Sequence, residues 1–81
     1  MKVQVKFFAA MREAMGRTEV ELDLPSGATV QQLVNVIAEQ YPLLNSYLDV
    51  TLIAVNRKYA RPHTELHPGD EVAFVPPVGG G

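Results

Sequence analysis

A single amphipathic segment constrains the fold of this 81-residue chain more than any other feature. One helical face with the i, i+3, i+4, i+7 spacing is formed by Val30, Leu33, Val34, Ile37 and Tyr41. Thr29 and Gln32 fit a capping box at the start of this segment, and Pro42 prevents its continuation. The sequence therefore predicts a main helix at about 30–41 that must bury one face against another element.

The remaining segments predict strands for that helix to cover. Apolar and polar residues alternate over 3–7 and 19–24, which is the period of a half-buried strand. Further strands are expected at 52–55, at 59–61 and at 71–75, with turns at 56–59 and 68–70 and a short helix at about 10–15. Segment 43–50 is a loop or a short turn of helix. We expect an α+β domain with a mixed sheet of about five strands and the main helix on one face.

Composition excludes several classes of function. A chain of this size, 47% hydrophobic, forms one small core and leaves little room for a catalytic cleft. The net charge of -2 argues against a nucleic-acid partner. Without cysteine there is no disulfide, thiolate nucleophile or cysteine-based metal site. The longest apolar run near the start is too short for a signal peptide or a membrane span, so we expect a cytoplasmic protein with no membrane partner.

The last six residues differ from the rest of the sequence. The run Pro76-Pro77-Val78-Gly79-Gly80-Gly81 combines prolines, which cannot donate ladder hydrogen bonds, with glycines that lack side chains. We therefore expect a domain over 1–75 and an extended, flexible tail over 76–81. Fully extended, such a tail reaches about 20 Å and fits a narrow tunnel on another protein. The alternative interpretation is a frayed terminus or an expression scar.

The chain resembles the small subunit of molybdopterin synthase, that is, the MoaD-type sulfur carriers of the MoaD/ThiS ubiquitin-like family. The resemblance rests on 5–9 with Arg12 and Glu13, on 54–56, and on the run Gly-Asp-Glu-Val-Ala-Phe-x-Pro-Pro-Val-x-Gly-Gly over 69–81. It spans essentially the whole sequence and implies a β-grasp fold. Gly79 and Val75 depart from the motif, where a residue with a side chain and an aromatic residue, respectively, are frequent.

The resemblance also implies a chemistry for the tail. The carboxylate of Gly81, after Gly80, would be adenylated with ATP, carry AMP transiently, and become a thiocarboxylate. Pro76, Pro77, Val78 and Gly79 would lie in a tunnel of the large synthase subunit, where the sulfur passes to a pterin precursor. The implied partners are that subunit in a heterotetramer, a ubiquitin-activating-type adenylyltransferase (MoeB-like) and a sulfur donor protein. The chain itself would bind no cofactor tightly and would have no stand-alone activity.

Strand alternation predicts where partners dock. If Val72 and Phe74 face the main helix, then Phe8 and Val75 lie outside the core and form an apolar patch at the root of the tail. Arg12 is close to Phe8 in sequence and would form a polar rim. Alternatively, Phe8 packs against the short helix and Arg12 is solvated.

Other interpretations of the function remain open. A thiamine-type sulfur carrier, a ubiquitin-like modifier conjugated through Gly81 and a binding module with an inert tail all fit the same outline. His63 and His67 are four residues apart but have no obvious third ligand, so we expect no metal site. Deletion of Gly80 and Gly81 separates carriers and modifiers, which lose function, from a module with an inert tail.

Overall fold

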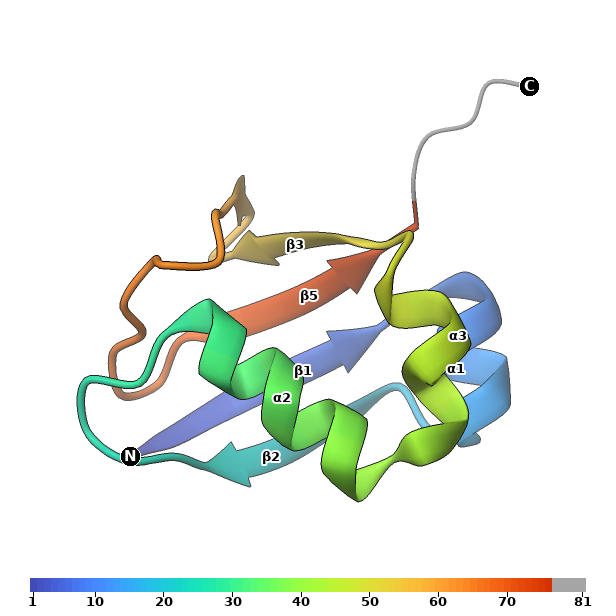
Figure 1. The fold of residues 1–81 in the computed structure, drawn as a ribbon, viewed down its shortest axis with the longest axis horizontal. Coiled ribbons are helices and arrows are strands. Elements are labelled where there is room, and N and C mark those ends of the chain that lie inside the picture. Colours follow the sequence, from blue (N-terminus) through green and yellow to red (C-terminus); the bar gives the residue numbers. More distant parts are fainter. Residues whose placement is uncertain (77–81) are drawn as a thin grey trace.

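The computed structural model describes residues 1–76, which form one mixed sheet and several helices (Figure 1). The elements in chain order are β1 (Lys2–Phe7), α1 (Ala9–Met15), β2 (Glu19–Asp23), α2 (Val30–Gln40), the 3-10 helix η1 (Pro42–Leu44), α3 (Asn45–Leu48), β3 (Leu52–Val55), β4 (Lys58–Tyr59) and β5 (Glu71–Val75). The strand order across the sheet is β2-β1-β5-β3-β4. This is the α+β architecture that the sequence predicts.

The last strand lies in the centre of the sheet. β5 pairs in parallel with β1 and antiparallel with β3, while β2 and β4 lie at the two edges. Figure 1 shows α2 crossing one face of this sheet. Within residues 1–76, no helix packs on the other face of the sheet.

The predicted helix signals are confirmed. Thr29 Oγ1 accepts a hydrogen bond from the backbone N–H of Gln32 at 3.3 Å, and Gln32 Oε1 accepts one from the backbone N–H of Thr29 at 2.8 Å. This reciprocal capping box satisfies two of the backbone donors that the start of α2 leaves without helical partners. α1 ends at Gly16, whose left-handed φ of 71° lets its N–H donate to the carbonyl of Arg12.

The structure corrects one prediction of detail and decides between the two alternatives of another. Strand β4 covers Lys58–Tyr59 and not 59–61, because Asn56 and Arg57 alone form the turn after β3. Both residues have positive φ, which is the geometry of a two-residue hairpin turn. Segment 43–50 contains the end of η1 and all of α3, so it is helical over much of its length.

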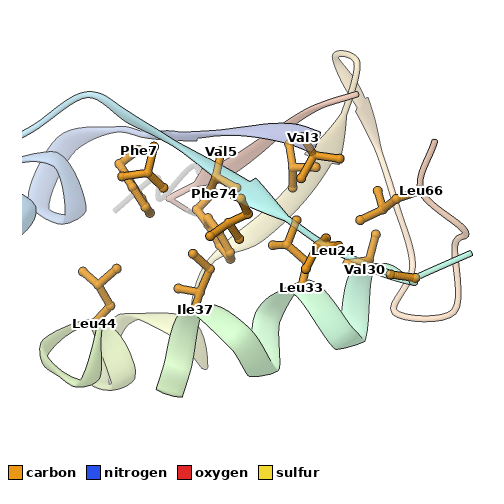
Figure 2. Packing of buried hydrophobic residues seen from close by; sticks show 14 of the residues in the cluster. Val3, Val5, Phe7, Leu24, Val30, Leu33, Ile37, Leu44, Leu66 and Phe74 are labelled. Carbon is orange, nitrogen blue, oxygen red and sulfur yellow. The ribbon is translucent and has the colours of Figure 1, made fainter. Parts of the chain in front are cut away.

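The core lies between the sheet and α2. In Figure 2, Val3, Val5, Phe7 and Phe74 project from the strands toward Leu33 and Ile37 of the helix. The rings of Phe7 and Phe74 stack with centroids 6.0 Å apart and planes 9° from parallel. Val30, Leu44 and Leu66 complete the cluster at its ends, and no buried side-chain polar atom of the described residues lacks a partner. The alternation in the strands therefore predicts the core face correctly.

Candidate functional site

The root of the tail is placed by the register of two parallel strands. Phe7 of β1 lies opposite Phe74 of β5, so Phe8 and Val75 follow at the same end of the sheet. Both side chains belong to the face that α2 does not cover, because their strand neighbours Phe7 and Phe74 point into the core. Pro76 follows directly and is exposed. The predictions for Pro77, Val78, Gly79, Gly80 and Gly81 lie outside the described residues.

Phe8 is held in place by the start of α1. Its backbone is extended, with φ -127° and ψ 159°, and its carbonyl accepts hydrogen bonds from the N–H groups of Met11 and Arg12. Ala9 then turns the chain with a φ of 51°. Phe8 as a residue remains 44% exposed, so it lies outside the core as predicted, and packing against the short helix does not bury it.

Phe8 and Val75 line one open hollow on the uncovered face of the sheet. The hollow has a volume of about 400 Å³, and its lining residues are Lys6, Phe8, Ala54, Arg57, Tyr59, Glu71, Ala73 and Val75. The ammonium of Lys6 lies 3.1 Å from the carboxylate of Glu71, bridging β1 and β5 in the floor of the hollow. We call these eight residues the tail-root hollow. It is concave, partly apolar and directly beside Pro76.

Arg12 lies in a neighbouring depression and not in the tail-root hollow. That depression is lined by Lys6, Phe7, Phe8, Arg12, Thr18 and Glu19. The structure therefore brings Arg12 together with Phe8, as predicted, while Val75 meets Phe8 on the other side. Phe8 and Lys6 line both depressions, so Phe8 shares one depression with Val75 and the other with Arg12.

Sequence reasoning missed two exposed apolar residues near this site. Leu52 lies opposite Val75 in the antiparallel ladder and is 44% exposed. Tyr59 lines the tail-root hollow and is 68% exposed. The run 52–55 is entirely apolar, so it shows no alternation, and only its pairing with β5 could assign its two faces. For Tyr59, the predicted fourth strand begins one residue too late, so the prediction does not assign the Tyr59 side chain to a face of the sheet.

The described residues show no arrangement for catalysis by metal. Within 1–76, no three His, Asp or Glu side chains gather closely enough to hold a metal ion. His67 Nδ1 lies 3.9 Å from Asp70, which also accepts a hydrogen bond from the backbone N–H of His67. In the same range, no helix is long and apolar enough to cross a bilayer. Within the described residues, the site offers an open, partly apolar surface that reaches Val75, the residue before Pro76.

A sequence model of the ThiS family matches residues 5–81. The chain belongs to the ThiS family. Two full-length relatives are both named molybdopterin synthase sulfur carrier subunit. The protein from Chlamydomonas reinhardtii is 37% identical, with all of both chains covered. The protein from Mycobacterium tuberculosis is 40% identical, with 100% of this chain and 99% of the relative covered. This family member thus matches its relatives from end to end.

Solved structures confirm the β-grasp fold of this family member. SAMP1 from Haloferax volcanii superposes with a TM-score of 0.90 at 28% identity, with all of both chains covered. A chain from the protein–protein complex of subunits 1 and 2 of molybdopterin-converting factor from Helicobacter pylori gives a TM-score of 0.73 at 27% identity, again with full coverage of both. The second structure is itself a complex of two different proteins.

Proposed function

We propose that this chain is the sulfur carrier subunit of molybdopterin synthase. The observation that carries the proposal is the position of Pro76, which follows the central strand directly after Val75, one of the residues that line an open, partly apolar hollow. A carrier needs both parts together, because the hollow lets a partner hold the domain while the tail enters that partner's active site. The end-to-end similarity to proteins named as such carriers supports the same assignment.

The proposed chemistry takes place at the carboxylate of Gly81. A carboxylate is a poor acceptor for sulfur at neutral pH, so a partner enzyme first joins it to AMP from ATP and releases pyrophosphate. Hydrosulfide supplied by a sulfur donor protein then attacks the acyl carbon and forms the C–S bond. The C–O bond to the phosphate of AMP breaks, AMP leaves with the bonding electron pair, and loss of the S–H proton gives a thiocarboxylate. Its sulfur is anionic and nucleophilic for the reason that thiolates are. The chain acts as a reagent, and the acid–base groups for sulfur transfer belong to the partner.

The proposed acceptor complex is formed with the large synthase subunit. The Helicobacter pylori relative was solved as a complex of subunits 1 and 2. By similarity, we assign the tail-root hollow and the neighbouring Arg12 to the contact with that subunit. Phe8 is the expected centre of this contact, since aromatic side chains in partly desolvated positions dominate many interfaces.

Deletion of Gly80 and Gly81 tests the proposal. The truncated chain should fold with an unchanged unfolding midpoint and fail completely to restore molybdopterin synthesis in a strain that lacks its own carrier. The matched control is a chain extended by one alanine after Gly81, which keeps both glycines but blocks the terminal carboxylate. Restored synthesis by either variant would contradict the proposal.

A second candidate function is protein modification through Gly81. The fold similarity to SAMP1, a small archaeal modifier protein, favours this alternative. The name of the matching family also leaves a thiamine-type sulfur acceptor as a further possibility. Mass spectrometry of the chain after incubation with ATP, a sulfur source and host extract distinguishes a sulfur carrier from a protein modifier. Exchange of one oxygen for one sulfur at Gly81 supports the carrier, and isopeptide adducts on lysines support the modifier.

A further inference from the structure

The turn between β3 and β4 has an unexpected residue at its second position. Asn56 has a φ of 51° and Arg57 a φ of 71°, so both central residues of this two-residue hairpin are left-handed. Asn-Gly is the favoured pair for such a turn, because glycine has no Cβ to clash with the backbone. Asn56 follows the rule and Arg57 does not. Unfavourable backbone conformations persist where the surrounding structure enforces them, and they concentrate at functional positions.

The surrounding structure does enforce this turn. The side chain of Asn56 donates to Asp70 Oδ1 at 2.9 Å and accepts from the backbone N–H of Glu71 at 3.0 Å. The backbone N–H of Asn56 also donates to the carbonyl of Glu71 at 2.8 Å. These bonds fix the turn to the start of β5, the strand that ends at the tail. Arg57 is thereby held at a constant position relative to the tail root.

The guanidinium of Arg57 is the available cation of the tail-root hollow. Lys6, the other cation lining it, is neutralised by Glu71 at 3.1 Å. Four ion pairs occur within residues 1–76, and none of them includes Arg57. The opposite edge strand, β2, carries the carboxylates Glu19, Glu21 and Asp23. The charge pattern across the sheet is therefore asymmetric, with arginine on the β4 side.

We infer that Arg57 is a specificity-determining contact, and that the large synthase subunit presents a carboxylate opposite the β3–β4 turn. This inference rests on the proposed function, because it assumes that the large subunit covers the tail-root hollow. A guanidinium forms planar, paired hydrogen bonds with a carboxylate. A charge fixed at one rim of the hollow selects one orientation of the partner and thereby aligns the tail with its tunnel.

Charge reversal at two neighbouring positions tests the contact. Arg57→Glu should weaken binding of the purified large subunit from the same organism by about tenfold or more, and the wild-type affinity should fall with added salt. Lys58→Glu is the matched control, since it makes the same change in net charge one residue away. Lys58 lies opposite Val55, which packs against the core, and it does not line the hollow. We expect Lys58→Glu to change the affinity by less than about threefold.

A glycine variant separates a recognition role from a structural one. Arg57→Gly relieves the left-handed strain, so its unfolding midpoint should stay at or above that of the wild type while its affinity falls as in Arg57→Glu. A fall in both quantities would show that the side chain supports the turn and would overturn the inference.

The binding titrations also distinguish failure of the inference from failure of the proposed function. If the wild-type chain binds and both charge reversals bind equally well, or are weakened equally, Arg57 makes no specific contact and the inference alone is wrong. If the wild-type chain fails to bind the large subunit at all, the proposed function falls together with the inference.

Discussion

The two faces of the central sheet are made by the same strands but have opposite environments. On β5, Val72 and Phe74 are fully buried against the helix side, while Glu71, Ala73 and Val75 on the other face remain partly exposed. The first face is closed by residues of this chain. The second is hollowed and continuous with the tail root. On the proposed function, folding and recognition thus use alternate residues of one strand.

This separation means that the two faces should respond differently to substitution. Changes on the helix-covered face should lower the free energy of unfolding, and changes on the uncovered face should lower affinity for partners. Each substitution can therefore be measured by two independent quantities. A substitution that lowers both the free energy of unfolding and the affinity for partners would contradict this separation of the two faces.

The largest effect on stability is expected for Phe74→Ala. Removing a fully buried ring that stacks on Phe7 should cost about 3–5 kcal/mol of unfolding free energy, through lost burial and the cavity that remains. Small domains have about 5–15 kcal/mol in total, so much of the stability would disappear. Urea denaturation followed by circular dichroism measures the change. Val75→Ala on the opposite face is the control, and an equal loss in both would contradict the assignment of faces.

The largest effect on binding is expected for Phe8→Asp. A charge at Phe8, in the lining of the tail-root hollow, should weaken binding to the large subunit by about 2 kcal/mol or more, which is about thirtyfold in Kd. The unfolding free energy should change by less than about 1 kcal/mol because Phe8 is already 44% exposed. Leu43→Asp is the matched control, since Leu43 is 56% exposed and lines no part of the hollow. Equal loss of affinity in both variants would argue against a localised contact.

A smaller effect is expected at the start of α2. Thr29→Ala removes the acceptor for the Gln32 N–H and should lower the unfolding free energy by about 1 kcal/mol. Thr29→Ser keeps the acceptor and should be nearly neutral. Thermal unfolding distinguishes the two variants, while affinity for the large subunit should stay constant in both. Reduced affinity in Thr29→Ala would show that the two faces are coupled through the helix.

The smallest effect is expected for the Lys6–Glu71 ion pair. Both side chains are more than a third exposed, so solvent screens the attraction and a double-mutant cycle should give about 0.2–1 kcal/mol. The cycle would use Lys6→Gln, Glu71→Gln and the double variant. A coupling energy that does not fall with added salt would indicate a stronger role for the pair than exposure predicts.

The sequence predicts the fold well where one physical signal acts alone. Alternation places Val5 and Phe74 in the core, and the capping box fixes the start of α2 within one residue. The start of β4 was misplaced because Arg57 lacks the glycine signal of a two-residue turn. The turn at Asn56 and Arg57 is held by the hydrogen bond from Asn56 to Asp70, two residues that are distant in the sequence.

The candidate site was predicted in part. Phe8 and Val75 follow from the parity of their strands, and the structure places them in one hollow. Leu52 and Arg57 could not be predicted, since their positions depend on pairing between strands that are far apart in the sequence. Local patterns therefore identify which face a residue occupies, whereas the neighbours it meets there depend on topology.

The central position of β5 has a mechanical consequence. On the proposed function, a partner that holds the tail would pull on Val75, and β5 is paired with β1 on one side and β3 on the other. The load is then shared by two ladders of hydrogen bonds that lie across the pulling direction, so they must yield together and cannot open one at a time as at an edge strand. On the proposed function, the domain would therefore resist unravelling when a partner pulls on the residues that follow β5.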